Sequence, residues 1–249
     1  MNTGVDINRN FDIVLDFNGK FFDAAAAAKF ATAVTPCTPS SPETYRGTAA
    51  NSEAETKNLK FLQEQALHFI DVHMDGRTIL VPWGFASNQT SDASKNFQNP
   101  TLHGKRGVAY AEFLPGSLQT KLTDVANFMH ESILRLGTTD ARAAASRALQ
   151  NDYKVTPSVG LYPASGCCDD FFFSRQFAVG PAPGFKETVP PPGRLAYTIE
   201  CGDGTEHGFF ADPTTEFPKI EREVHAGLWG FLARLVDPAR AVGPGWPFL

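Results

Sequence analysis

A stripe of apolar residues in the middle of the chain is the strongest constraint on its fold. The stripe consists of Leu122, Val125, Met129, Ile133 and Leu136. Residues at this spacing lie on one face of a helix, so we predict a helix over 118–136 that ends before Gly137. A similar pattern predicts a last helix over 219–235, with Ile220, Val224, Leu228, Phe231 and Leu235 facing inward. Both stripes are expected to belong to the core.

Four stretches have the pattern of β-strands, at 69–73, 78–83, 159–165 and 194–201. Further helices are expected at 139–149, from Asp169 to Gln176, and over about four turns after Glu53. In the last of these, Leu59, Leu62 and Ala66 recur at helical spacing, and the run Ala24–Ala28 could form a short helix as well. With 249 residues and 42% hydrophobic residues, the chain is long enough for one α/β domain with a buried core.

Charge and hydropathy argue against several classes of partner. A net charge of −5 argues against nucleic acid, because binding to phosphates needs a basic face. The sequence contains no apolar run long enough to span a bilayer, so no membrane partner is expected. The first residues lack the basic and then apolar layout of a signal peptide. The compartment is therefore left unassigned.

Cysteine spacing and loop composition leave alternatives open. The four cysteines, at 37, 167, 168 and 201, fit neither a zinc finger nor a disulfide framework, so free or partly buried thiols are expected. Residues 86–116 read as a long polar loop, which is either a binding element or a plain surface insertion. Residues 181–193 read as a proline-rich loop.

The run Gly4–Phe11, GVDINRNF, is the most specific in the chain. It sets the amide of Asn8 beside the guanidinium of Arg9. A guanidinium presents a rigid fork of donors that matches a carboxylate, and a neighbouring amide can add another donor. By residue type, this pair indicates a carboxylate receptor, and an ordinary polar turn is the alternative.

Two strands carry polar residues at or near their ends. His73 ends the strand at 69–73, with Asp71 on the same face. A neutral imidazole there could bind a metal ion, or it could be an ordinary hydrogen-bonded histidine. Glu200 lies among apolar neighbours such as Tyr197 and Phe209, which should exclude water and raise its pKa. That suits a general base, and a solvent-facing glutamate is the alternative.

A loop supplies two further candidates. Tyr162 lies in the run LYPASG, and a phenol combines an aromatic lid with a polar tip. Asp169 follows shortly afterwards, beside Asp170. A carboxylate at the floor of a pocket would attract a cationic side chain, but the same two residues could also cap a helix.

Four segments, GVDINRNF, FIDVHMDG, LYPASG and YTIECGD, resemble in order the motifs of zinc metallocarboxypeptidases of the carboxypeptidase A and B type. The resemblance implies an α/β fold with a mixed, mostly parallel twisted sheet flanked by helices. It also implies roles for six residues: Asn8 and Arg9 hold the substrate's C-terminal carboxylate, Tyr162 closes over the substrate, His73 binds zinc, Glu200 is the general base, and Asp169 favours C-terminal Lys or Arg as in carboxypeptidase B.

The sequence departs from the family pattern at its start. The family's HxxE zinc-ligand pair and its carbonyl-polarising arginine precede the GVDxNRN run, whereas only Met1–Thr3 precede that run here. We therefore expect residues 1–249 to be a single, N-terminally truncated domain without its N-terminal strands. It would supply one zinc ligand, with two missing. His68 is no substitute, because it lies on the same short strand as His73.

Two functions follow from this interpretation. The first is a zinc-dependent carboxypeptidase, of which this sequence is a truncated part, that removes the C-terminal residue of peptides when complete. The second is a non-catalytic module that binds the C-terminal carboxylates of peptides. The expected partners are peptide or protein C-termini in both cases. Family members are usually secreted, although this chain shows no signal peptide.

Overall fold

The computed structural model describes residues 4–14, 21–30, 44–139, 153–177, 193–202 and 210–241, with the backbone alone for 136–139. The chain divides into two compact units. The first unit comprises Met1–Phe69, Pro82–Gln119 and Pro157–Ala196, and the second comprises Ile70–Val81, Thr120–Thr156 and Tyr197–Leu249. Each unit is described by itself, and the single-domain organisation stays a prediction.

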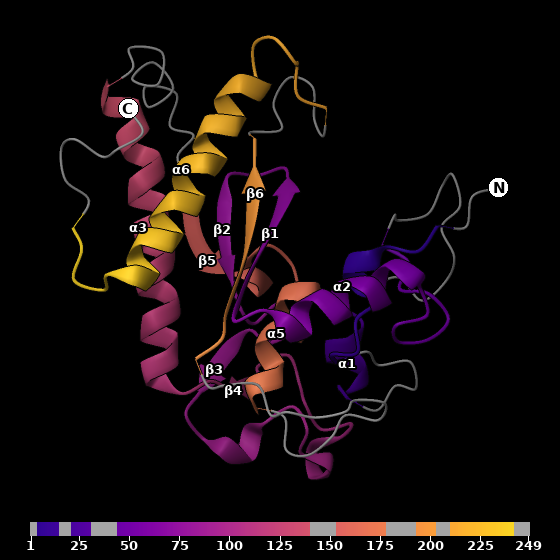
Figure 1. The fold of residues 1–249 in the computed structure, drawn as a ribbon. Coiled ribbons are helices and arrows are strands. Elements are labelled where there is room, and N and C mark those ends of the chain that lie inside the picture. The colour runs from indigo at the N-terminus through magenta and orange to yellow at the C-terminus, as the bar shows by residue number, and fades with distance from the viewer. Residues whose placement is uncertain are drawn as a thin grey trace. The chain divides into compact units, whose positions relative to one another are not determined.

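A four-stranded sheet forms the centre of the second unit. Its strands, in spatial order, are β1 (His68–Met74), β6 (Leu195–Cys201), β2 (Thr78–Val81) and β5 (Lys154–Pro157). Strands β2 and β6 are antiparallel, with Thr78 opposite Glu200, whereas the arrows of β1 and β6 point the same way in Figure 1. The sheet is therefore mixed.

Strand β6 lies between β1 and β2 in the sheet, and every one of its residues is buried. A strand covered on both faces reads as a continuous apolar run rather than as an alternation of apolar and polar residues. Tyr197 and Ile199 have no exposed surface at all, and neither does Ile79 on the neighbouring strand β2. This burial holds the backbone around Glu200 in place.

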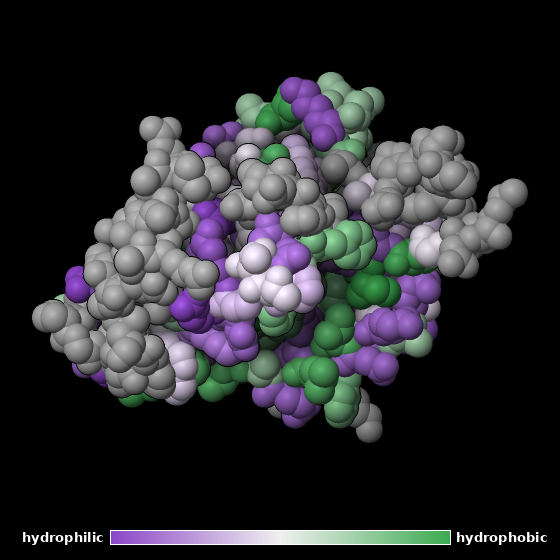
Figure 2. Space-filling view, turned by 90° about the horizontal axis from the view of Figure 1, so that it is seen from above, coloured by the Kyte–Doolittle hydropathy of each residue, from purple (hydrophilic) through white to green (hydrophobic). Residues whose placement is uncertain are grey.

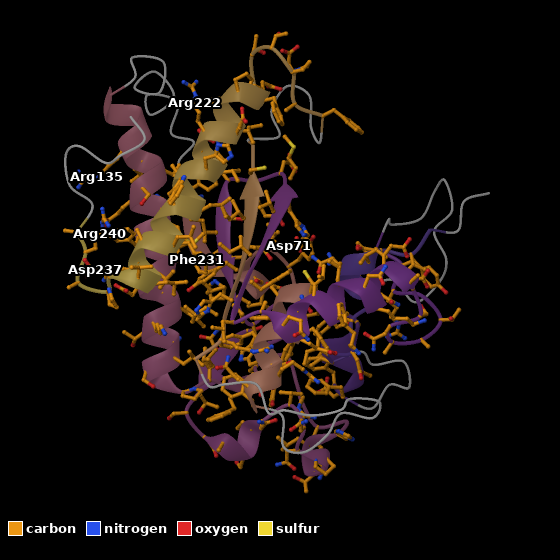
Figure 3. All side chains as sticks on the ribbon, viewed as in Figure 1. Asp71, Arg135, Arg222, Phe231, Asp237 and Arg240 are labelled. Atoms are coloured by element: carbon orange, nitrogen blue, oxygen red, sulfur yellow. The ribbon has the colours of Figure 1, made fainter. Side chains whose placement is uncertain are left out.

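Two long helices pack on this sheet, α3 (Gly116–Thr139) and α6 (Phe217–Val236). They approach closely at Gly227 of α6, where an added Cβ would lie 3.3 Å from Ile133 of α3 and 3.8 Å from Ile199 of β6. The ring of Phe231, labelled on α6 in Figure 3, lies 5.8 Å from that of Tyr197. The two predicted helices are confirmed. The predicted end at Gly137 is wrong, because α3 continues to Thr139.

The inward face predicted for α6 is confirmed in part. Ile220 and Phe231 are buried, whereas Val224, Leu228 and Leu235 are only half-buried. The strand predictions at 69–73 and 194–201 are confirmed by β1 and β6. Strand β2 covers the predicted stretch 78–83 only as far as Val81.

Among its described residues, the first unit contains three shorter helices and a pair of parallel strands. These are α1 (Ala24–Ala27), α2 (Ala54–Gln65), α5 (Cys168–Ser174), β3 (Asn88–Thr90) and β4 (Ala111–Phe113). Its core is aromatic: the Trp83 ring lies 5.1 Å from the rings of both Phe85 and Phe173. The helices expected after Glu53, at Ala24–Ala28 and at Asp169–Gln176 are confirmed by α2, α1 and α5 with its following 3-10 turn (Arg175–Phe177).

The buried residues of α2 are polar. Leu62 is 61% exposed, whereas Thr56 and Gln63 are buried. The buried face is polar because Gln63 has a specific partner: its Nε2 donates a hydrogen bond of 3.2 Å to the carbonyl of Cys168 in α5. This bond pairs the amide nitrogen of Gln63, and sequence spacing does not reveal such a partner.

Two further predictions need correction. The strand expected at 159–165 is absent, because β5 ends at Pro157 and a 3-10 turn (Ser158–Gly160) follows. Proline lacks the N–H that would continue a strand. The long loop at 86–116 is structured: besides β3 and β4 it holds 3-10 turns at Ala93–Lys95 and Pro100–Leu102.

Arg106 organises this segment from inside. It is 1% exposed, its guanidinium lies 4.0 Å from the centre of the Phe21 ring, and it donates hydrogen bonds to the carbonyls of Asn96, Phe97 and Asn99. The helix expected at 139–149 and the loop expected at 181–193 lie almost entirely outside the described residues.

The surface of the described residues mixes polar and apolar side chains, as Figure 2 shows for one face. Phe61, Leu62 and Leu67 are each 60% exposed or more. Among the described helices, none has the length and apolar character that crossing a membrane requires.

Candidate active site

Asn8 and Arg9 lie in a single 3-10 turn, Ile7–Arg9, near the start of the first unit. Asp6 caps this turn: its side chain accepts a hydrogen bond of 2.9 Å from the Asn8 backbone N–H, and its carbonyl accepts one of 3.0 Å from that of Arg9. An aspartate at this position satisfies donors that the turn cannot pair internally. The cap therefore fixes the direction in which both side chains leave the backbone.

The Arg9 guanidinium is held by neighbours on several sides. Its Nη2 donates to the Tyr162 hydroxyl at 3.2 Å, and its Nη1 donates to the Asn8 carbonyl at 2.7 Å and lies 3.7 Å from Sγ of Cys167. Burial lowers the pKa of Arg9, but the Coulombic effects of Cys167 and Asp6 and the contact with Tyr162 raise it overall. Arg9 is therefore a charged and nearly buried group.

Tyr162 covers this guanidinium from the solvent side. It is 43% exposed, and the centre of its ring lies 5.7 Å from Cζ of Arg9. A guanidinium at this distance from an aromatic face is attracted by the ring's quadrupole. The structure thus brings together two residues 153 positions apart in the sequence.

The Asn8 amide has a defined orientation. Its Oδ1 accepts a hydrogen bond of 2.7 Å from the backbone N–H of Cys168, the first residue of α5. No described residue accepts a hydrogen bond from its Nδ2. Helix N-termini leave backbone donors without internal partners, so this contact caps α5 and fixes the orientation of the Asn8 side chain.

Asp169 and Asp170 lie in the first turn of α5, and both are buried. Asp169 accepts a hydrogen bond of 3.3 Å from Ser158, and Asp170 accepts from the Gly84 N–H at 2.9 Å and 3.1 Å through its two oxygens. Burial and the adjacent Asp169 raise the pKa of Asp170 well above its usual range. The pair therefore holds fewer charges than its composition suggests.

His73 and Glu200 lie together in the second unit, on β1 and β6. The Nδ1 atom of His73 is 3.8 Å from Oε1 of Glu200, and its Nε2 atom is 2.6 Å from Oδ2 of Asp71, which Figure 3 labels on β1. A proton on Nε2 that is donated to Asp71 leaves the lone pair on Nδ1. The expectation that Asp71 and His73 share a face is confirmed.

The described residues do not make a complete metal site. Within them, no three or more His, Cys, Asp or Glu side chains are grouped so that they could hold a metal ion. His73 has the carboxylate-oriented imidazole that metal ligands usually have, so it fits one ligand position. Because a structural or catalytic zinc needs at least three protein ligands, the described residues alone would not hold a zinc ion.

The candidate residues thus fall into two groups. Asn8, Arg9, Tyr162 and Asp169 lie in the first unit. His73 and Glu200 lie in the second unit, and the convergence of the two groups on one site stays a prediction. Sequence reasoning missed Asn10, which is completely buried beside the receptor, although its place between Arg9 and Phe11 in the GVDINRNF run was a signal.

Comparison with models of protein families identifies the family of this chain. A model described as zinc carboxypeptidase matches residues 1–226, most of the chain. The chain belongs to the zinc carboxypeptidase family. This confirms the resemblance of its four motifs, and zinc is the metal that this family's description implies. No curated protein sequence gave a significant match.

Solved structures share the fold of this chain. Bovine thrombin-activatable fibrinolysis inhibitor in complex with tick carboxypeptidase inhibitor matches with a TM-score of 0.58 and 16% identity, over 95% of this chain and 58% of that one. A second structure of thrombin-activatable fibrinolysis inhibitor matches with a TM-score of 0.57 and 17% identity, over 94% and 42%. Carboxypeptidase A from Helicoverpa armigera matches with a TM-score of 0.52 and 18% identity, over 95% and 44%.

These likenesses confirm the predicted fold class, an α/β fold with a mixed, mostly parallel sheet flanked by helices. The chain spans about half the length of the solved structures that it matches, between 42% and 58%. Activity and substrates of the whole enzymes therefore come to this chain only as proposals.

Proposed function

We propose that this chain carries the substrate-binding residues and the general base of a zinc-dependent carboxypeptidase, which hydrolyses the C-terminal peptide bond of its substrates. The observation that carries the proposal is the arrangement of Asn8, Arg9 and Tyr162. The Arg9 guanidinium contacts the Tyr162 ring and hydroxyl, and the amide of Asn8, the preceding residue, is oriented by the N–H of Cys168. Such a set of donors matches the two oxygens of a carboxylate.

The donors define which end of a peptide would bind. In this proposal, the C-terminal carboxylate accepts hydrogen bonds from Nδ2 of Asn8 and from the guanidinium of Arg9. The Tyr162 hydroxyl, which accepts from Arg9 at 3.2 Å, would give up that bond or share it with the ligand. Glu200 would take the proton of the attacking water, and His73 would be one of the zinc ligands.

Asp169 would set the preference for the C-terminal side chain. It is 3% exposed, and it lies beside Asp170, whose pKa burial raises well above the usual range. A buried carboxylate attracts a cationic group strongly because water screens it little. We therefore propose a preference for peptides that end in Lys or Arg.

The carboxylate receptor can be tested without catalysis. We expect a peptide with a free C-terminal carboxylate to bind more tightly than the same peptide with a C-terminal amide, by calorimetry. Arg9→Lys should reduce the ratio of the two dissociation constants, amide peptide over free-carboxylate peptide, by about tenfold, because an ammonium cannot reproduce the guanidinium fork. Equal binding of the two peptides to the unaltered chain would overturn the proposal.

A second candidate function is a non-catalytic module that recognises peptide C-termini. It is favoured by the lack of a complete metal group among the described residues. Under this alternative, a chelator leaves binding of the free-carboxylate peptide unchanged and no hydrolysis accompanies binding. Release of the C-terminal residue that requires zinc and is lost in Glu200→Gln would favour the enzyme instead.

A further inference from the structure

Asn10 lies immediately after Asn8 and Arg9, and its side chain is bound to one segment of the chain. Its Nδ2, which carries two hydrogens, lies within hydrogen-bond distance of three acceptors: the Arg46 carbonyl at 2.8 Å, the Ala49 carbonyl at 3.0 Å and Oγ of Ser52 at 3.0 Å. These three acceptors all belong to one short segment, 46–52, which precedes α2.

The other polar atoms of Asn10 bind the same region. Its Oδ1 accepts from the backbone N–H of Glu53, the N-cap residue of α2, at 3.2 Å, and its carbonyl accepts from the N–H of Asn51 at 2.7 Å. Asn10 has no exposed surface. Its amide is thus completely buried and paired at both ends, which is the condition for a polar group to be buried without a large cost.

The surrounding backbone leaves room for this amide and little more. Gly47 has a positive φ of +81°, and a Cβ at that position would lie 2.8 Å from Nδ2 of Asn10 and 2.7 Å from Oγ of Ser52. The segment 46–52 is therefore shaped around the Asn10 side chain. It could not accept a bulkier or differently shaped group without shifting.

The consequence concerns the turn that holds the receptor. Ile7–Arg9 is a 3-10 turn of three residues, Asn8 has φ and ψ outside the helical region, and Asn10 is its C-cap residue. So short a turn has little stability of its own, because 3-10 hydrogen bonds are weaker than α-helical ones. Its C-terminal end is fixed by the Asn10 side chain, while Asp6 fixes its N-terminal end.

We propose that Asn10 is a positioning residue of the carboxylate receptor: by anchoring the end of the turn to segment 46–52, it holds Asn8 and Arg9 at the spacing that a carboxylate requires. Asn10 touches no ligand in this arrangement. Binding sites need their donors placed to within about 0.5 Å, so loss of the anchor should weaken recognition of the carboxylate rather than abolish the fold. The inference rests on the proposed function.

The test compares two peptides that differ only at the C-terminus, one with a free carboxylate and one with an amide. The dissociation constant of the amide peptide divided by that of the free-carboxylate peptide measures carboxylate recognition. A general loss of stability does not change this ratio. We expect Asn10→Ala to lower the ratio by about tenfold, with the amide peptide bound as by the unaltered chain. Asn96→Ala is the matched control, because Nδ2 of Asn96 also donates to a backbone carbonyl, that of Phe177, at 3.2 Å.

A second variant keeps the test decisive if Asn10→Ala does not fold. Ser52→Ala removes one of the three acceptors of Nδ2 and should lower the ratio by about threefold. An unchanged ratio in a folded Asn10 variant, together with a reduced ratio in Arg9→Lys, would overturn the positioning role and leave the proposed function intact. No difference between the two peptides for the unaltered chain would overturn the proposed function and this inference with it.

Discussion

Nη2 of Arg9 donates a hydrogen bond of 3.2 Å to the hydroxyl of Tyr162, and this contact joins the start of the chain to a loop 153 residues later. The hydroxyl occupies a donor of the guanidinium that a carboxylate oxygen would use. In the free protein, Tyr162 therefore keeps Arg9 oriented and partly paired. Ligand binding would exchange one acceptor for a charged one, which is the stronger hydrogen bond.

Replacing Tyr162 by Phe keeps the ring and removes the hydroxyl. We expect binding of a free-carboxylate peptide to weaken by about threefold to tenfold, because the hydroxyl that accepts from Arg9 keeps its own proton for a carboxylate oxygen, and one hydrogen bond contributes about 0.5–1.5 kcal/mol. Calorimetry with the amide peptide as the control measures the effect. Weaker binding of both peptides to the same extent would show that the hydroxyl does not act through the carboxylate.

The contact between Asp71 and His73 predicts a tautomer. With Nε2 donating to Asp71 at 2.6 Å, the neutral imidazole should carry its proton on Nε2. Nitrogen chemical shifts of labelled histidine should report this tautomer in the unaltered chain and a mixture in Asp71→Asn. An Nδ1-protonated ring in the unaltered chain would contradict the orientation needed for metal binding through Nδ1.

Glu112 gives the first unit a pH-dependent stability. It has no exposed surface, and burial raises its pKa from an ordinary value of 4.5 to about 8. The folded state thus holds a proton that the unfolded state releases. Between these two pKa values the free energy of unfolding should fall as pH rises, with a slope of at most about 1.4 kcal/mol per pH unit.

The variant Glu112→Gln isolates this contribution, because an amide does not titrate and can still accept from the Phe113 N–H. Denaturant unfolding at several pH values between about 5 and 8 should show a flatter dependence in the variant. The same slope in both proteins would assign the pH dependence to other groups, such as Asp170, whose pKa is raised as well.

The packing of α6 on α3 depends on Gly230. A Cβ there would lie 2.5 Å from Oγ and 2.9 Å from Cβ of Ser132, and 3.2 Å from the backbone of Met129. Gly230→Ala should therefore destabilise the second unit by about 1–3 kcal/mol, even though alanine favours helices. Gly116→Ala, where nothing lies within 4 Å of the added methyl, is the control and should not destabilise, as thermal unfolding would show.

Sequence patterns predicted the long elements well. Local periodicity predicted the helices α3 and α6 and the strands β1 and β6. The buried face of a helix or strand needs apolar residues at the spacing of that element, so the pattern can be seen in the sequence. The strand expected at 159–165 failed because two prolines, Pro157 and Pro163, outweigh the apolar residues between them. The burial of Gln63 in α2 does not follow from local periodicity, because it reflects a contact with Cys168, a residue 105 positions away.

What the sequence determined by itself is the family and the types of residue at the candidate site, because motifs such as GVDINRNF preserve chemistry in a short run. What only the tertiary structure decided is which groups are held against one another: Arg9 against Tyr162, Asn8 against the start of α5, and Asn10 inside segment 46–52. Such contacts join residues far apart in the chain. The strength of these contacts depends on distance and burial, and neither can be predicted from neighbouring residues in the sequence.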